Sequence, residues 1–446
     1  MTVDELSAGL ARVASRVGLG ALSDAPQRLT GGAVMESWRF ACGDAAYVLR
    51  RAPSLAFIDG RPYGPATEAA LIEAARAKGV TAPEVVAVLM EADGLGSGFV
   101  MRALPGTADP KVVLACDDPE GLLRQAARDL ARIHSLPQAD VPEGVPVMDY
   151  RAAIADLKQQ FMEAGGDRPI IALGLRWLED NCPAEVEPVL NHGDYRMGNL
   201  LVKGSALTGV LDWEIAHFGD RHEDLAFGCM AVWRFARYDR PALGLGSIAD
   251  YIAAYEAEAR VKIDPARFRF WTIYRTVWWA LGCLKMAAQW RSGADRMLER
   301  VVISRRTSEQ ELDLLLLLEE DAPEAERDRE VIDHAPYLRN SGEAQLSELA
   351  LAVSEWLASV KDQFSGHDRF QYAVARNALG IIMREDEHIP LRPDRAQIPA
   401  ILSGQLNLNR REFLQELRED ALRKVTVDSP KYPALAHAHK IWTGEN

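Results

Sequence analysis

NHGDYRMGN at residues 191–199, followed by LDWE at residues 211–214, is the stretch of sequence that decides the fold of this chain. Residues 200–203 and 207–211 between the two motifs have a strand pattern and are separated by Gly204 and Ser205, which predicts a β-hairpin. A hairpin returns the chain to the point where it began. The spacing therefore predicts that Asp212 lies beside Asn199.

Asp194, Asn199 and Asp212 are the side-chain types that phosphoryl transfer requires. The reaction needs a carboxylate that orients the attacking hydroxyl and accepts its proton, and it needs oxygen ligands for Mg²⁺ between the phosphates. Asp194 suits the first task. Asn199 and Asp212 suit the second, because Mg²⁺ prefers oxygen ligands and keeps several waters. The motifs therefore predict an ATP- and Mg²⁺-dependent kinase with Asp194 as the catalytic residue.

The pattern His192-Gly193-Asp194, Asn199 and Asp212-Trp213-Glu214 resembles the signature of the aminoglycoside phosphotransferase family. The longer match, which adds DLA at residues 224–226, is similar to the kinase-like domains associated with acyl-CoA dehydrogenases. This resemblance covers roughly residues 1–320. It implies an α+β, two-lobed protein-kinase-like fold with a mainly helical C-lobe.

The same resemblance implies where the nucleotide binds. Arg50 on a strand would hold the phosphates and pair with Glu68 on a helix. The turn at Gly31 and Gly32 would cover the phosphates, and the backbone of Met101 and Ala103 would meet adenine. Arg50 stands where most kinases have lysine, and arginine keeps its charge at any relevant pH. Arg51 is the alternative, although strand alternation places it on the opposite face.

Four further residues are expected to support this site. His192 is expected to hold the loop by hydrogen bonding rather than to act as a base, and Asp224 to brace the loops rather than to bind metal. Glu214 is either a second metal ligand or an ion-pair partner, so one and two bound metals stay open. Arg196, together with Arg221, is a candidate for a basic entrance that would suit a CoA thioester.

Apolar periodicity predicts the surrounding elements. Thr2 and Glu5 form a capping-box pattern at the start of a first helix. Strands are predicted at 38–42, 46–50, 85–90 and 98–102, with a helix from Pro65 to Gly79 among them. Helical patterns dominate after Pro105. We therefore expect an N-lobe at residues 1–103 and a C-lobe at residues 104–320.

Residues 321–343 have many acids and no apolar period, which predicts a linker, and residues 344–446 are expected to form an all-α C-terminal domain. This domain is a candidate surface for a homodimer or a protein partner. The aromatic residues Trp271, Tyr274, Trp278 and Trp279 are expected in the core rather than along a substrate wall. Arg275 and Lys285 interrupt the apolar segment at 271–290, which favours a buried or amphipathic helix over a membrane span.

The net charge of −14 disfavours nucleic acid and membrane surfaces as partners. Five widely spaced cysteines favour a reduced, cytoplasmic protein. We expect transfer of the ATP γ-phosphate to a hydroxyl of a small molecule, and the narrower resemblance favours a hydroxy acid or hydroxyacyl-CoA. The alternatives are an aminoglycoside kinase and a non-catalytic nucleotide-binding or scaffold module.

Overall fold

The computed structural model describes residues 1–29, 35–52, 61–235, 237–296, 298–322, 342–387, 426–427 and 430–431. The chain divides into two compact units, the first with residues 1–281 and 309–329 and the second with residues 282–308 and 330–446. The first unit holds the predicted N-lobe and the predicted C-lobe apart from residues 282–308. The predicted domain boundaries at 103, 320 and 343 stay a prediction, and residues 282–308 group with the C-terminal residues.

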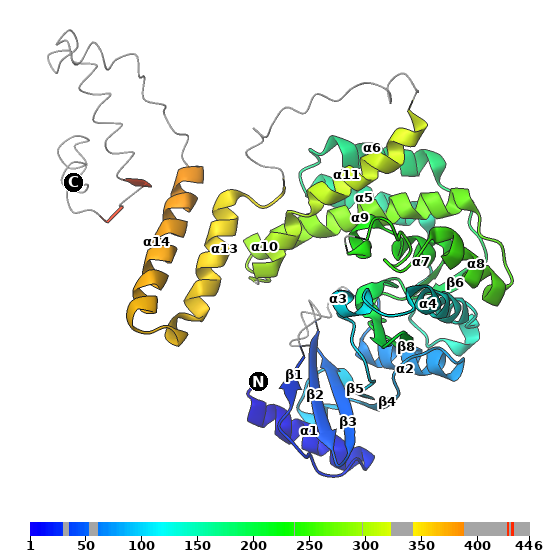
Figure 1. The fold of residues 1–446 in the computed structure, drawn as a ribbon, viewed down its shortest axis with the longest axis horizontal. Helices are drawn as coiled ribbons and strands as arrows, with labels where there is room; N and C mark the ends of the chain where they lie inside the picture. Colours follow the sequence, from blue (N-terminus) through cyan, green and yellow to red (C-terminus); the bar gives the residue numbers. More distant parts are fainter. Residues whose placement is uncertain are drawn as a thin grey trace, which may run out of the picture. The chain divides into compact units, whose positions relative to one another are not determined.

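The N-lobe contains a five-stranded antiparallel sheet in the order β1-β2-β3-β5-β4 (Figure 1). Its strands are β1 Gln27–Arg28, β2 Glu36–Cys42, β3 Ala45–Arg51, β4 Val85–Val88 and β5 Gly98–Arg102. Gly43, with φ of 58°, makes the tight turn between β2 and β3. The four strands predicted from the sequence are all present, with ends that differ by at most two residues.

Helices cover both faces of this sheet. The helix α1 (Val3–Val17) begins with the predicted capping box of Thr2 and Glu5, and it buries Leu6 and Leu10 against one face. The helix α2 (Pro65–Ala77) buries Leu71 on the face that carries Phe99. A fully buried leucine contributes about 1.5–3 kcal/mol relative to an exposed one. Side chains alternate along a strand, so the face beneath α2 also receives Arg50.

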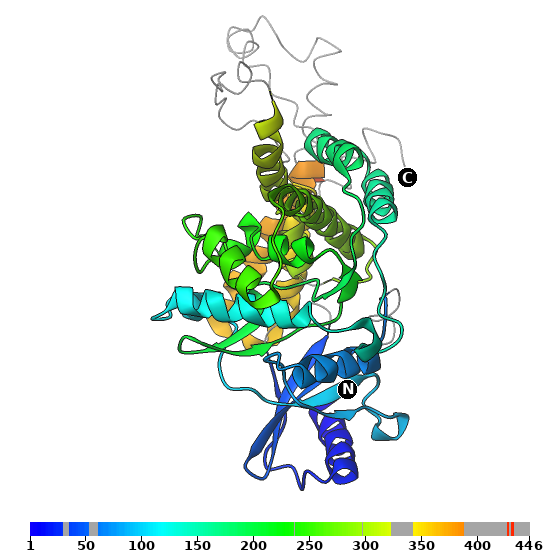
Figure 2. The ribbon, with the colours of Figure 1, turned by 90° about the vertical axis from the view of Figure 1, so that its right-hand side faces the viewer.

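The C-lobe is mainly helical and has two short antiparallel strand pairs. One pair is β6 (Val189–Asn191) with β9 (His217–Gly219), and the other is the predicted hairpin of β7 (Leu200–Lys203) with β8 (Ala206–Val210). Its helices are α3 Pro110–Val113, α4 Pro119–Ile133, α5 Tyr150–Glu163, α6 Pro169–Asn181, α7 Arg221–Phe227, α8 Ile248–Ala259, α9 Pro265–Arg291 and α11 Thr307–Leu318. Figure 2 shows α4, in cyan, between the N-lobe strands and the green helices. The predicted two-lobed α+β architecture is confirmed.

One apolar core joins α2 and β5 to the C-lobe, with Trp213, Tyr195 and Tyr251 fully buried in it. Trp271 and Tyr274 are also buried, as expected. Trp278 and Trp279 are half-buried beside Phe227, Met230 and Trp233. The core thus fixes the strands and helices that carry the two motifs.

The second unit contains α10 (Leu298–Ser304), α13 (Leu346–Ser359) and α14 (Gly366–Glu387). The two helix patterns predicted around 346–360 and 370–382 correspond to α13 and α14, which pack together (Figure 1). Arg291 at the end of α9 forms ion pairs with Glu343 and Glu348 within this unit. In the part of the chain that the structure describes, every helix is too short or too polar to cross a bilayer.

Candidate active site

The loop after β6 places Asp194 in a ring of hydrogen bonds. Arg196 donates from Nε to Oδ1 of Asp194 at 2.7 Å, and Asn199 donates from Nδ2 to Oδ2 at 2.6 Å. Asn199 also donates to the Asp194 carbonyl at 2.9 Å. Burial raises the pKa of Asp194, against the opposing charge of Arg196. The amide nitrogen of Asn199 faces Asp194, so its amide oxygen faces the other way.

The β7–β8 hairpin returns the chain as predicted. The Leu211 amide donates to the Asn199 carbonyl at 2.9 Å, which places Asp212 next to Asn199. Asp212 has φ of 69°, in the left-handed region that residues other than glycine seldom adopt. This backbone conformation turns the Asp212 carboxylate towards the N-lobe and costs on the order of 1 kcal/mol.

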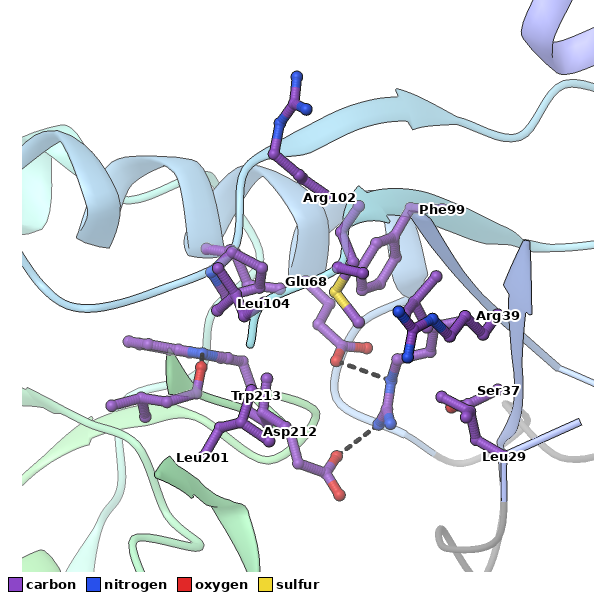
Figure 3. A pocket seen from close by; sticks show the side chains of 18 of the residues that line it. Leu29, Ser37, Arg39, Glu68, Phe99, Arg102, Leu104, Leu201, Asp212 and Trp213 are labelled. Carbon is purple, nitrogen blue, oxygen red and sulfur yellow. Dashed lines mark hydrogen bonds and ion pairs between the residues drawn. The ribbon is translucent and has the colours of Figure 1, made fainter. Parts of the chain in front are cut away.

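Arg50 connects the N-lobe to this second motif. Its guanidinium forms ion pairs with Glu68 at 3.1 Å, with Glu214 at 2.7 Å and with Asp212. Figure 3 shows Glu68 and Asp212 directed towards the same guanidinium. Burial lowers the pKa of Arg50, but the three carboxylates outweigh that effect and raise it. Arg51 faces the other side of the sheet and pairs with Glu36 at 3.6 Å.

Glu214 forms a second ion pair with Arg61 at 3.0 Å. Burial raises the pKa of Glu214 to about 7, and the nearby charge of Asp212 adds to the rise against Arg50 and Arg61. When it is ionised, Glu214 is an ion-pair partner of Arg50 and Arg61. Arg61 had no signal in the sequence, because it lies in a loop outside every motif.

A cavity of about 250 Å³ begins at Arg50, Glu68 and Asp212 and extends between the lobes. The predicted Met101 and Ala103 both line it. Its apolar lining includes Leu29, Val48, Ile72, Phe99, Met101, Leu104, Leu201 and Val210 (Figure 3). Arg39 on β2, which sequence reasoning missed, also lines this cavity. The predicted turn at Gly31 and Gly32 lies outside the described residues.

The amides of Ala103 and Leu104 in the cavity wall differ in their hydrogen bonds. The Ala103 amide donates to the Ala46 carbonyl at 2.9 Å, so it already has an acceptor. Within the described part of the chain, the Leu104 amide donates to no other group. The Leu104 amide, next to the predicted Ala103, is therefore an available backbone donor on this wall.

Asp224 and His192 hold the Asp194 loop from below. Asp224 accepts hydrogen bonds from the amides of His192 at 2.5 Å and Gly193 at 2.8 Å, and it contacts His134 Nε2 at 3.2 Å. His192 uses Nε2 to donate to the Leu211 carbonyl at 3.1 Å and Nδ1 to accept from the Asp194 amide at 3.2 Å. Burial lowers the pKa of His192, which favours the neutral ring. Both residues occupy positions that suit a brace.

Arg196 and Arg221 occupy different surroundings. The Arg196 guanidinium lies 4.4 Å from the centre of the Trp233 ring, beside Asp194. Arg221 lies beside Tyr255, whose hydroxyl contacts His134. Only Arg196 of these two predicted basic residues is placed against the Asp194 carboxylate.

Comparison with known proteins identifies the family of the chain. The phosphotransferase enzyme family matches residues 27–271, more than half of the chain. Acyl-CoA dehydrogenase family member 10 of Mus musculus is 26% identical over 231 residues, or 48% of this chain and 22% of that protein. The probable acyl-CoA dehydrogenase IBR3 of Arabidopsis thaliana is 27% identical over 173 residues, or 34% of this chain and 20% of that protein. The chain thus spans about a fifth of the length of these relatives.

A solved structure from Ralstonia eutropha JMP134, named as an aminoglycoside phosphotransferase, has the same fold. It superposes with a TM-score of 0.57 at 19% identity, and the match covers 70% of this chain and 98% of that one. The predicted resemblance to this family and to proteins named for acyl-CoA dehydrogenases is confirmed. The family match over more than half of the chain shows that it belongs to the phosphotransferase enzyme family.

Proposed function

We propose that the chain transfers the γ-phosphate of ATP to a hydroxyl of a small anionic molecule, a hydroxy acid or a hydroxyacyl-CoA. One observation carries this proposal: Asp212 lines the cavity together with Arg50 and Glu68, and the backbone contact of Leu211 with Asn199 brings Asn199 and its partner Asp194 next to Asp212. Family membership supports the phosphotransferase activity. The identity of the donor and the acceptor is our proposal.

Asp194 would act as the proton acceptor. The acceptor oxygen attacks the γ-phosphorus, the bond from that phosphorus to the bridging oxygen of ADP breaks, and the hydroxyl proton moves to the Asp194 carboxylate. The hydrogen bonds from Asn199 and Arg196 orient this carboxylate. Its raised pKa makes Asp194 a stronger proton acceptor than an exposed aspartate.

The residues fit a magnesium ion. Asn199 has its amide oxygen turned away from Asp194, and Asp212 supplies a carboxylate next to it, which is the oxygen set that Mg²⁺ prefers. A bound Mg²⁺ would neutralise charge on the phosphate oxygens. The ion pairs of Glu214 with Arg50 and Arg61 favour a single metal site in the state described here.

The cavity would take the base and sugar of the nucleotide. Its apolar walls suit the faces of a purine, and the Leu104 amide is the donor available to the purine edge. Arg50 would grip the phosphates through the planar donor pairs of its guanidinium. We therefore propose the Leu104 amide as the backbone donor to the purine, with the predicted Met101 and Ala103 beside it in the cavity wall.

The surroundings of Asp194 favour an anionic acceptor. Arg196 uses Nε for Asp194 and packs its guanidinium on Trp233, so its remaining N–H groups lie beside the proposed base. A carboxylate or phosphate on the acceptor could bind these donors, whereas a polycationic aminoglycoside would meet like charge. The names of the two curated relatives support acceptors of the acyl-CoA class.

An ADP-release assay with MgATP tests the proposal. We expect turnover with hydroxy acids or hydroxyacyl-CoA thioesters, and a strongly lowered rate when Asp194 is replaced by asparagine. Turnover with an aminoglycoside panel alone would overturn the proposed acceptor. Mg²⁺-dependent ATP binding without turnover on any acceptor would favour the non-catalytic module.

A further inference from the structure

Arg275 is a buried cation that reaches the proposed catalytic loop from α9. It is 3% exposed, and its Nη2 donates to the Gly193 carbonyl at 2.8 Å. Its Nε lies 2.8 Å from Oε1 of Glu223. The rings of Phe227 and Trp278 each lie with their centres 4.8 Å from the guanidinium carbon.

Gly193 is the residue at which the loop turns into the site. Its φ is +82°, and a Cβ at this position would lie 2.5 Å from the Ile215 carbonyl oxygen, so the position requires glycine. The Gly193 amide donates to Asp224 and its carbonyl accepts from Arg275. That carbonyl belongs to the same peptide unit as the Asp194 amide, which donates to His192.

Three side chains therefore fix the backbone immediately before Asp194. Asp224 and His192 hold the N–H groups, and Arg275 holds the carbonyl oxygen. Without Arg275 the peptide plane between Gly193 and Asp194 would keep only its N–H contact and could rotate. Rotation of that plane would move the Asp194 carboxylate.

We propose that Arg275 is a positioning residue, which fixes the Gly193 carbonyl and thereby the Asp194 carboxylate. The proposal rests on the function proposed for Asp194. A misplacement of about 1 Å in a reacting group can cost on the order of 100-fold in rate. Residues that orient a reacting group through the backbone therefore affect the rate without touching the substrate.

The charge and the polar contacts of Arg275 on α9 favour a positioning role over packing alone. A buried arginine has a large desolvation cost, and an apolar residue of similar size often stabilises a core equally well. Lys285 on the same helix is exposed, as expected for a cation without such a function. Glu223 also contacts His217 Nε2 at 2.9 Å, so Arg275 belongs to a buried polar chain that ends at Gly193.

The variants must separate lost stability from lost positioning. Arg275→Met alone leaves Glu223 buried without its cation and is expected to fold poorly. The double variant Arg275→Met/Glu223→Gln removes both charges at similar volume, and the Gly193 contact is lost. Arg275→Lys keeps the charge but lacks the second arm of the guanidinium. Lys285→Met is the matched control on α9.

We expect the double variant to lose about 10- to 100-fold in kcat, with KM for ATP within twofold of wild type. Arg275→Lys should retain more activity than the double variant, and Lys285→Met should equal wild type. Hydrogen exchange measured on the peptide that spans 189–199 should become faster in the double variant. If the double variant does not fold, kcat and hydrogen exchange are measured on Arg275→Lys instead. We then expect a smaller fall in kcat and a smaller increase in the exchange rate.

Hydrogen exchange distinguishes a failure of this proposal from a failure of the proposed function. If wild type shows no transfer to any acceptor, faster hydrogen exchange in the folded double variant still supports the proposal that Arg275 fixes the Gly193 carbonyl. Unchanged exchange overturns it, whatever happens to kcat. Equal exchange and equal kcat would show that Arg275 serves packing alone.

Discussion

The two halves of the site are held in different ways. Asp194 lies on a loop whose backbone N–H groups donate to Asp224 and His192 and whose Gly193 carbonyl accepts from Arg275. Asp212 lies in a cluster of ion pairs around Arg50, and those charges can exchange partners. The comparison distinguishes a rigid half, where we propose that the proton is accepted, from an exchangeable half, where we propose that nucleotide and metal bind.

The largest expected effect is at the rigid half. Asp194→Asn should lower kcat by about 10³- to 10⁴-fold, because the amide cannot accept the hydroxyl proton. Isothermal titration should give the same Kd for ATP as wild type within about twofold. Near-wild-type transfer by Asp194→Asn would contradict the proposed role of Asp194, and the two halves of the site would then no longer differ in function as proposed.

Asp224→Asn tests the brace beneath that loop. The amide side chain has one acceptor oxygen for the two backbone N–H groups, and the charge-assisted hydrogen bonds are lost. Urea unfolding should show a loss of about 2–4 kcal/mol, together with a fall in kcat of roughly 100-fold. An Asp224→Asn protein with wild-type kcat would show that the loop does not need this brace.

Arg50→Met tests the exchangeable half, and Arg51→Met is its control on the opposite face of β3. Removal of Arg50 should raise KM for ATP by roughly 10- to 100-fold, since each lost charge-assisted hydrogen bond costs about 1.5–3 kcal/mol. Arg51→Met should leave KM unchanged. Steady-state kinetics at saturating acceptor gives both values, and a larger KM change in Arg51→Met would reverse the assignment.

The smallest effect concerns pH. The pKa of Glu214 is raised to about 7 in the folded protein from its ordinary value near 4.5, so the folded state holds the proton over that interval. The free energy of unfolding contributed by this group is therefore full below pH 4.5 and falls as pH rises towards 7. In Glu214→Gln, the fall in the free energy of unfolding between pH 4.5 and 7 should be smaller by on the order of 1–3 kcal/mol. Denaturant unfolding of wild type and Glu214→Gln at pH 5, 6 and 7 measures the difference. An equal loss of stability with pH in both proteins would show that another group takes up the proton.

Local patterns predicted much of this architecture. The hairpin between the motifs is set by two short strands and a Gly204-Ser205 turn, so its return of Asp212 to Asn199 follows from nearby residues. Strand alternation separated Arg50 from Arg51 for the same reason. The family resemblance supplied the partner Glu68, which the residues alone would have left as one of many acids.

Other contacts could not be predicted from the sequence, because they join residues far apart in the chain. Arg275 meets Gly193 across 82 positions, and its only trace was a cation in an apolar helix. The family resemblance predicts backbone groups of Met101 and Ala103 for adenine, but the hydrogen bond of the Ala103 amide to Ala46 depends on how β3 pairs with β5, which the sequence does not specify. Arg61 reaches Glu214 from a loop without a pattern.

The ion pair between Arg50 and Asp212 has a consequence for the order in which ligands bind. Each member of the pair is a proposed contact for a different ligand, Arg50 for phosphate and Asp212 for the cation. Phosphate bound at Arg50 without a cation adds negative charge beside Asp212, Glu68 and Glu214, whereas a cation bound at Asp212 at the same time offsets that charge. By thermodynamic linkage, each ligand should therefore strengthen the binding of the other, and free ATP and free Mg²⁺ should bind more weakly than MgATP.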